Sequence, residues 1–290
     1  MKMIKTKLAK AVAIAATGAA LSLGMSSTAS AHVMYNTYNM DGLKSGTDGW
    51  THESQKTGAA VPWLGTAGGV NPFGFAGIQA LNWAVAIHDA NSSHEVSQAA
   101  AITAYGASAT VDLDTVDGAW GSWPVDENNP NSGRRGWAHH VDYGLIKSDI
   151  ETDIVIDVSS LNGIIDNFGI TVFTGMDDGT AGYGHHSEWN TDYLSGVYEA
   201  PAQVDDPHGT NGVNYLTHGD SGTVTFHAMA DQVYSIYLGG NEVGGQNFGD
   251  LDGYVLNVST VSAVPVPAAA WLFGTGLMGL VSLGRRKQKA

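Results

Sequence analysis

The sequence predicts a mainly β protein, either an antiparallel β-sandwich or an open barrel, with one short helix near residues 93–104. The 38 glycines in 290 residues are about twice the average usage and are typical of a chain with many turns. Short strand-like runs separated by Gly and Asp turns, with no long helical period between them, favour the same class. A chain of this length with 43% hydrophobic residues can also bury a large core.

Seven short runs are rich in β-branched and aromatic residues. Several alternate, as where Val172 and Thr174 share one face and Thr171 and Phe173 share the other. The predicted strands cover residues 82–88, 109–114, 153–158, 169–174, 223–228, 233–238 and 254–259. The Pro- and Asn-rich stretch 124–136 is expected to be a long loop, and residues 35–77 show no helical period.

The single helix is predicted from its two ends. Ser92 and Glu95 have the spacing of a capping box. Apolar residues follow as far as Ala104, and Gly106 suits a helix stop.

Residues 1–31 have the pattern of a secretory signal peptide. Four lysines precede an apolar stretch from Ala11 to Leu23, and Ala29-Ser30-Ala31 matches a signal peptidase cleavage site. Cleavage there would make His32 the first residue. An ordinary amphipathic helix is the alternative. Residues 32–262 are then predicted to form one β-rich extracellular domain.

Residues 263–290 form a hydrophobic segment that ends in Arg285-Arg286-Lys287. Its apolar part, 268–283, would make a helix of about 24 Å, just short of the ~30 Å hydrocarbon core. A plain membrane anchor, with the basic residues left in the cytoplasm, is one interpretation.

The same C-terminal segment resembles the PEP-CTERM sorting signal, with Pro265-Val266-Pro267 where that signal has Pro-Glu-Pro. The resemblance implies a Gram-negative host, transient inner-membrane anchoring and recognition by an exosortase-type enzyme. It also implies release to the cell surface or the medium, where extracellular polysaccharide is a candidate partner.

The charge distribution excludes some partners and favours others. Eight of the 13 basic residues lie in the two end segments, so the interior carries five basic and all 28 acidic residues, a net charge of −23. Such an interior repels phosphate backbones, which argues against nucleic-acid binding, and it attracts cations. The chain has no Cys, so a transition metal would need imidazole, carboxylate or carbonyl ligands.

All 11 histidines lie in this acidic interior, which makes copper or zinc binding a reasonable hypothesis. If residues 136–140 are extended, Trp137 and His139 share one face and His140 takes the other. A Trp beside an imidazole can exclude water from a metal pocket. The alternative is that Trp137 and His139 serve packing, and the other histidines taken singly are more simply hydrogen-bonded loop residues.

Several motifs together resemble the CorA/MopE surface copper-binding proteins of methane-oxidising bacteria. They include Asn82-Trp83-Ala84-Val85, Gly136-Trp137-Ala138-His139 and Val172-Phe173-Thr174-Gly175. The resemblance implies a copper ion, more often Cu(I), held by two His and an oxidised Trp two residues before one of them. Carried over by motif, Trp137 is the modifiable Trp and His139 its His. His88 is the first choice for the second His, and His208 is the next.

The sequence thus predicts an exported, cell-surface copper-binding protein for copper acquisition or storage. A structural or adhesive matrix protein is the main alternative, with Trp50, Trp63, Trp120 and Trp123 as surface aromatics that could stack on sugars. A copper enzyme that chelates through the freed amine and ring of His32 is a second alternative, although spacing indicates no second His for it.

Calcium is a further candidate ligand, for the carboxylates of Asp112, Asp114, Asp117, Asp250 and Asp252. No hydrolase triad, phosphate loop or HExxH motif stands out, so a binding protein is expected rather than an enzyme.

Overall fold

The computed structural model describes residues 32–36, 63–77, 81–122, 135–137, 140–180, 205–241 and 251–261, without the side chains of residues 121–122, 135–137 and 208. All of them lie in one compact unit, Ala31–Ala290. The strands are β1 His32–Asn36, β2 Trp63–Leu64, β3 Leu81–Ile87, β4 Ser93–Val96, β5 Asp114–Val116, β6 Trp120–Ser122, β7 Arg135–Trp137, β8 Asp142–Ser148, β9 Thr152–Ser160, β10 Phe168–Thr174, β11 Asn214–Gly219, β12 Thr223–Ala228, β13 Val233–Gly240 and β14 Leu251–Val261. The helical elements are η3 Ala67–Gly69, η4 Pro72–Gly74, α2 Gln98–Tyr105 and η5 Pro207–Gly209.

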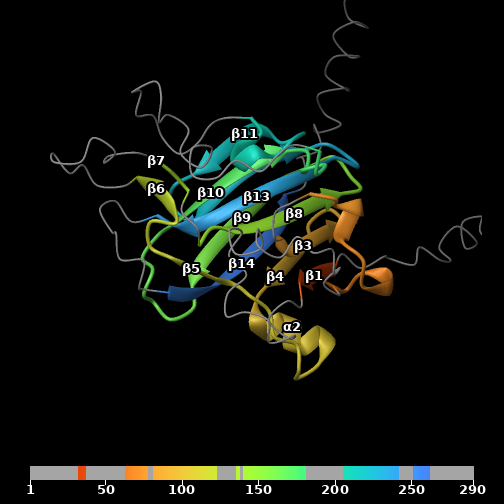
Figure 1. Ribbon diagram of the computed structural model, residues 1–290. Coiled ribbons are helices and arrows are strands. Elements are labelled where there is room, and N and C mark those ends of the chain that lie inside the picture. The colour runs from red at the N-terminus through yellow and green to blue at the C-terminus, as the bar shows by residue number, and fades with distance from the viewer. Residues whose placement is uncertain are drawn as a thin grey trace, which may run out of the picture. The chain divides into compact units, whose positions relative to one another are not determined.

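The predicted mainly β class is confirmed (Figure 1). One sheet has seven strands in the order β11-β10-β13-β8-β3-β1-β2, and a second has five, in which β12-β9-β14-β4 are joined by β5 at β14. β6 and β7 form a separate two-stranded ribbon. The sheets are mostly antiparallel, as predicted, with the exception that β3 and β8 pair in parallel. The long connection from β3 to β8 contains β4, α2 and the β6–β7 ribbon, and parallel neighbours need such a crossover.

The main hydrophobic core lies between the two large sheets. Trp83, Ile146 and Val172 enter it from the seven-stranded sheet, and Ile156 and Leu256 enter it from the five-stranded sheet. All five side chains are fully buried. The arrangement is therefore a sandwich rather than an open barrel.

A second core covers the other face of the seven-stranded sheet, where Ala84, Leu145 and Phe173 pack with Trp63 and Trp120. Because both faces of this sheet are covered, β3 is buried at every position, as expected for a strand between two layers. β12 alternates exposed and buried residues instead, because the five-stranded sheet contributes only to the core between the sheets.

Trp63 and Trp120, which the adhesive hypothesis placed on the surface, are 6% and 1% exposed. That expectation is wrong for these two residues, because both belong to the second core. Trp50 and Trp123 lie outside the described residues.

Six of the seven predicted strands match β3, β9, β10, β12, β13 and β14. The prediction of a strand at residues 109–114 is wrong except for Asp114, with which β5 begins. Here the backbone forms hydrogen bonds with a side chain and not with a neighbouring strand. Gln98 donates to the Ala109 carbonyl at 2.6 Å and accepts from the Val111 amide at 3.1 Å. Within the predicted loop 124–136, Arg135 and Gly136 belong to β7, and the rest lies outside the described residues.

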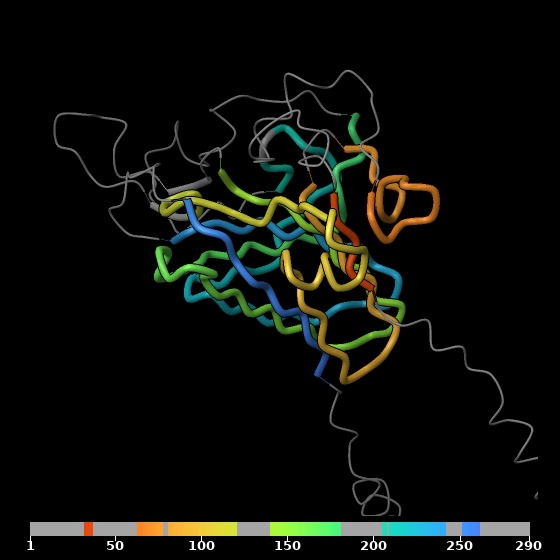
Figure 2. The backbone as a smooth tube through the Cα atoms, turned by 90° about the horizontal axis from the view of Figure 1, so that it is seen from below, coloured from red at the N-terminus to blue at the C-terminus, as the bar shows by residue number. Residues whose placement is uncertain are grey.

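The helix begins later than predicted. Residues 93–96 form strand β4, which pairs with β14, and the N-cap of α2 is Ser97, whose hydroxyl accepts from the Ala100 amide at 2.9 Å. Gly106 is the C-cap, as predicted. Sheet pairing with β14 takes precedence over the capping-box spacing of Ser92 and Glu95. α2 lies below β4 and β14 in Figure 1 and in front of the strands in Figure 2.

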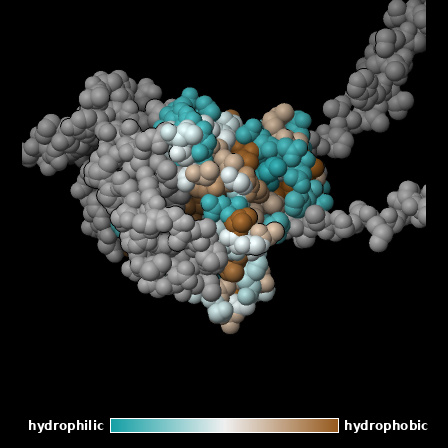
Figure 3. Space-filling model, turned by 45° about the vertical axis from the view of Figure 1, so that its right-hand side comes forward, coloured by the Kyte–Doolittle hydropathy of each residue, from teal (hydrophilic) through white to brown (hydrophobic). Residues whose placement is uncertain are grey.

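Large apolar side chains reach the surface from separate elements, with Val70 59% and Leu161 58% exposed. Figure 3 shows the described part of one face as a mixture of hydrophilic and hydrophobic residues. Within the described ranges, no helix is long and apolar enough to span a bilayer. The predicted signal and C-terminal hydrophobic helices lie outside those ranges.

Candidate metal centre

Three histidines gather where the edges of the two large sheets approach each other. His32 begins β1 and pairs with Ala86 of β3, so it lies beside the end of β3 that leads to His88. His94 comes from β4 of the opposite sheet, where it pairs with Val258. Strands β1 and β4 contact each other across the sandwich, which brings imidazoles from both sheets into one region.

His32 and His88 form the closest pair of rings in this cluster. Their ring centroids are 6.1 Å apart and the ring planes differ by 28°. His88 is also oriented by a carboxylate, since its Nδ1 lies 2.5 Å from Oδ2 of Asp149. Asp149 follows β8, and its amide donates to the Ile87 carbonyl at 2.9 Å.

The contact with Asp149 resembles the outer contacts of a metal-bound histidine. In metal sites, the ring nitrogen that does not bind the metal usually donates to a carboxylate, which fixes the tautomer and raises the basicity of the other nitrogen. With Nδ1–H directed to Asp149, Nε2 of His88 keeps its lone pair. The side chain of His88 is 22% exposed, so a solvated ion can reach it.

His94 brings a buried nitrogen to the same cluster. Its Nε2 atom is inaccessible to solvent, and no described group lies within hydrogen-bond distance of it. Burial lowers the pKa of His94, and the nearby His88 and His32 rings lower it further against the opposing effect of Asp89. The neutral imidazole, which is the metal-binding form, is therefore favoured at this position.

The three imidazoles are a ligand type suited to copper and zinc. Across the part of the chain that the structure describes, no three His, Asp or Glu side chains surround a common metal position. The cluster thus supplies ring nitrogens in one place but does not form a complete cage from side chains alone.

Two of the predicted metal ligands, Trp137 and His139, lie where one described part of the chain ends. The backbone of Trp137 ends β7 and pairs with Trp120 of β6, while its side chain and all of His139 lie outside the described residues. His208 belongs to η5, and its side chain is likewise outside them. These three assignments stay predictions.

The topology separates His88 from the segment that contains Trp137. Because β3 and β8 are parallel, Leu81 pairs with Tyr143 and Ile87 pairs with Ser148. His88 therefore follows one end of this strand pair, and His140 precedes the other. Six residues of strand at about 3.3 Å each put the two ends roughly 20 Å apart. The structure thus brings His88 together with His32 and His94, and does not bring it to the Trp137 segment.

His218, on β11, is a described imidazole that lies near Trp120 of the β6–β7 ribbon. Its ring centroid lies 6.1 Å from that of Trp120, and its Nδ1 is 2.7 Å from the hydroxyl of Tyr215. Trp120 is fixed beneath it, because its indole NH donates to Oγ1 of Thr171 at 2.8 Å.

The residues that follow His140 are held by a buried hydrogen-bond chain. The indole NH of Trp83 donates to the Tyr254 hydroxyl at 3.1 Å, and that hydroxyl donates to Oδ2 of Asp142 at 2.6 Å. Burial raises the pKa of Tyr254 well above its usual value, and the charge of Asp142 raises it further. The phenol therefore remains a donor and fixes the start of β8, directly after the predicted Trp137–His139 segment.

Asp252 is one of the predicted calcium ligands, and its carboxylate oxygens accept hydrogen bonds from other groups of the protein. It is 1% exposed and accepts hydrogen bonds from the Ser160 hydroxyl, from both nitrogens of Asn162 and from the Ile164 and Ile165 amides. Asp252 lies within strand β14 rather than in a turn. Its role here is to hold the 160–165 connection.

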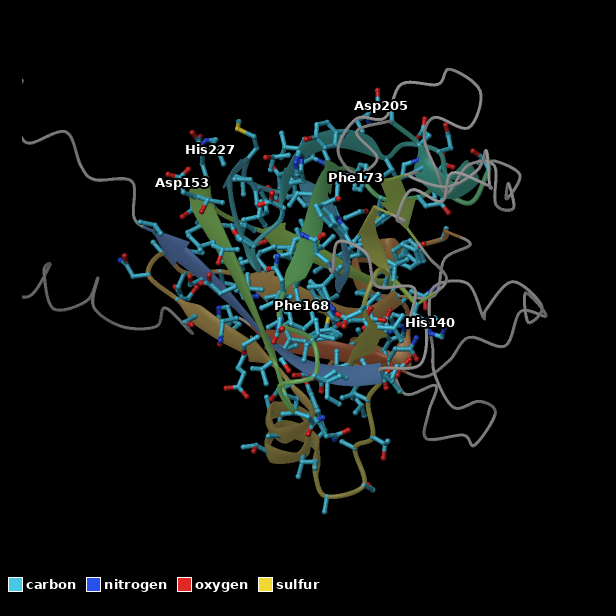
Figure 4. The ribbon with its side chains drawn as sticks, turned by 90° about the vertical axis from the view of Figure 1, so that its left-hand side faces the viewer. His140, Asp153, Phe168, Phe173, Asp205 and His227 are labelled. Carbon is cyan, nitrogen blue, oxygen red and sulfur yellow. The ribbon has the colours of Figure 1, made fainter. Side chains whose placement is uncertain are left out.

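His227 forms a separate, exposed charge cluster on β12, beside Asp153 in Figure 4. Its Nδ1 lies 2.8 Å from Asp153, and its Nε2 lies 3.2 Å from Glu151. The hydrogen bonds to Asp153 and then Glu151 raise the pKa of His227.

We expect the NMR titration midpoint of His227 to lie above the ordinary value of about 6.5 and to fall in Asp153→Asn. Because the folded pKa is raised, the stabilisation is present below the unfolded pKa and is lost as pH rises through the folded pKa. Asp157→Asn, which changes an exposed aspartate on the same strand as Asp153, should leave the titration midpoint of His227 unchanged. A midpoint at or below about 6.5 would contradict the expected ion pair.

Comparison with known proteins gives a structural likeness only. No family model and no curated protein matches this chain. CorA of Methylomicrobium album BG8, described as a surface-associated copper-binding protein important in copper acquisition, is 12% identical over 60% of this chain and 97% of its own, with a TM-score of 0.30. MopE of Methylococcus capsulatus, a secreted protein solved after mercury soaking, in which an oxidised tryptophan facilitates copper binding, is 10% identical over 61% and 86%, with a TM-score of 0.29.

The likeness to CorA and MopE is thus a distant one in structure. These identities and TM-scores are too low to transfer a site or a function. The function proposed below consequently depends on the residues of this chain.

Proposed function

We propose that this chain is an exported protein that binds copper through imidazole nitrogens, for acquisition or storage rather than for catalysis. The observation that carries the proposal is the cluster of His32, His88 and His94, in which a carboxylate orients His88 and Nε2 of His94 is buried without a described partner.

Copper is favoured by the available donors and by the surrounding charge. The chain has no Cys, and imidazole binds both copper oxidation states without exposing a redox-labile thiol. Among divalent first-row metals, copper is the one that nitrogen ligands hold most tightly. The net charge of −23 in the interior raises the local concentration of cations within a Debye length of about 8 Å.

A second copper position is proposed at the residues that the CorA/MopE resemblance implies. There Trp137, in oxidised form, and His139 would hold Cu(I), with His208 as the remaining choice for the second His. His88 is assigned to the other cluster because of its position at the far end of β8.

Export and sorting complete the proposal. Signal peptidase would remove residues 1–31, and an exosortase-type enzyme would act on residues 263–290 after transient membrane anchoring. The product would remain at the cell surface, in contact with extracellular polysaccharide, or would be secreted.

The test is the copper content and copper affinity of protein recovered after export from a Gram-negative host. We expect His88→Ala and His94→Ala each to weaken copper binding about tenfold or more, measured by competition with a chelator. His139→Ala, with intact-mass analysis of Trp137 oxidation, tests the second position in the same assay.

His227→Ala is the matched control, because His227 is a carboxylate-bound histidine outside the cluster. It should retain the full copper content, and melting curves without copper should show that each variant folds. Wild-type protein that binds no copper would overturn the proposal. Binding that survives loss of both His88 and His94 but not of His139 would move the function entirely to the second position.

A further inference from the structure

We infer that removal of the signal peptide completes the His32–His88–His94 centre, because it frees the α-amine of His32 to chelate copper(II) together with the ring of His32 and the ring of His88. The inference rests on the proposed copper function and specifies how that site is regulated. It adds a backbone nitrogen to a cluster whose described side chains alone do not surround a metal position.

His32 has a defined position in the fold. It is the first residue of β1 and is in register with Ala86 of β3, so its backbone belongs to the sheet. Its ring stacks on that of His88 with 6.1 Å between centroids. An amine created at this residue would therefore be held beside a second imidazole without a flexible linker.

An N-terminal histidine can bind a metal ion through two of its nitrogens. The amine nitrogen, Cα, Cβ, Cγ and Nδ1 close a six-membered ring with a metal ion, so one residue supplies two ligands. A free α-amine binds a metal through its lone pair once it has released its proton, as other nitrogen ligands do. Before cleavage this nitrogen belongs to the amide between Ala31 and His32, and a neutral amide nitrogen is a poor ligand.

The remaining nitrogens come from His88 and His94. His88 offers Nε2, because its Nδ1 contacts Asp149 at 2.5 Å. Two nitrogens from His32 and one from His88 would give three ligands, from residues whose ring centroids lie 6.1 Å apart. Nε2 of His94, which is buried and has no described hydrogen-bond partner, is a further nitrogen in the same region.

The consequence is that copper affinity depends on processing. The Ala29-Ser30-Ala31 cleavage pattern lies directly before His32. Unprocessed chain in the cytoplasm would bind copper(II) weakly, and the exported chain would bind it tightly. The sequence alternative of a chelating His32 had no second histidine by spacing, and the fold supplies His88.

The experiment compares two full-length chains that are exported and processed in the same host. One is the natural sequence, and the other has Gly-Ser-Gly-Ser inserted between Ala31 and His32. Four residues are inserted because a histidine at the second or third position can chelate through the new backbone amides. N-terminal sequencing verifies cleavage after Ala31 in both, and a chelator competition measures affinity for added copper(II).

We expect the insertion to lower the copper(II) affinity about a hundredfold, which is the scale lost when a second contact is no longer tethered to the first. His88→Ala should weaken binding by the natural processed chain. The melting temperatures of the two chains without copper should agree, so that the difference reports ligation and not folding.

Equal affinity of the two processed chains, both weakened by His88→Ala, would overturn this inference and leave the proposed copper function intact. Failure of both chains to bind copper in either oxidation state would overturn both this inference and the proposed function. An affinity that is lowered by the insertion but unaffected by His88→Ala would also contradict the inferred centre, because it would show that the amine acts without His88.

Discussion

Replacing Gly169 with alanine is expected to lower the free energy of unfolding by about 3 kcal/mol or more, which is the upper part of the usual range for overpacking a core. A Cβ at this position would lie 1.8 Å from Cδ2 of Trp120. The indole cannot move aside easily, because it is 1% exposed and its NH is bound to Thr171. Gly239 is in register with Gly169 on β13, and a Cβ there would lie 2.8 Å from Cβ of Ala119 and 2.9 Å from the backbone nitrogen of Trp120.

Denaturant unfolding of Gly169→Ala and of Gly68→Ala measures this effect. Gly68 has a positive φ, of 72°, but no atom lies within 4 Å of the place that an added Cβ would take, so only the cost of the left-handed backbone conformation, about 1–2 kcal/mol, is expected there. Trp120→Leu combined with Gly169→Ala should lose less stability than the sum of the two single changes. Equal losses for the two glycines, or additive losses in the double variant, would contradict the packing described for Trp120.

The same contact bears on the second proposed copper position. Trp120 belongs to β6, which pairs with β7 at Trp137. A change that displaces Trp120 should therefore also disturb the segment that contains Trp137 and His139, and it should leave the His32–His88–His94 cluster in place.

The second large effect is expected for Asp252→Asn, which should destabilise the fold by about 3 kcal/mol at neutral pH. Hydrogen bonds to a charged group each contribute about 1.5–3 kcal/mol, and buried donors left without an acceptor are costly. Asn keeps one acceptor oxygen, but its NH₂ group would face donors such as the Ile164 and Ile165 amides. The 160–165 connection between β9 and β10 should loosen first.

This effect should depend on pH in a defined direction. Burial by itself raises the pKa of Asp252, but the hydrogen bonds from Ser160, Ile164, Asn162 and Ile165 outweigh it and lower the pKa below its ordinary value. Its stabilisation is then fully present above the unfolded pKa of about 3.9 and is lost as pH falls through the folded pKa. The difference in free energy of unfolding between wild type and Asp252→Asn should accordingly become smaller in acid.

Denaturant unfolding at neutral pH and at about pH 3 tests both statements. Asp157→Asn is the control, because Asp157 is an exposed aspartate that accepts from Thr223, and its loss should change stability by no more than about 0.5 kcal/mol. A loss of stability in Asp252→Asn as small as that of Asp157→Asn, or a loss that becomes larger in acid, would contradict the hydrogen-bond network assigned to Asp252.

The sequence by itself determined the mainly β class, because strand-forming runs and glycine-rich turns are local properties. It also indicated His88 and, through the cleavage pattern, His32 as candidate ligands. His94 was missed because it lies in the stretch predicted as helix, and pairing with β14 made that stretch strand β4. Strand β8 was missed because its pattern includes Gly144, and that glycine is needed where the Trp83 ring packs against it.

Only the tertiary structure decided which histidines meet. The parallel pairing of β3 with β8 puts His88 at the far end from the Trp137 segment, and the approach of β1 to β4 brings it to His32 and His94 instead. Strand order and direction are set by contacts between residues far apart in the chain, in two cores that cover both faces of one sheet. Local patterns do not contain that information, so they identified candidate ligands but could not group them into a centre.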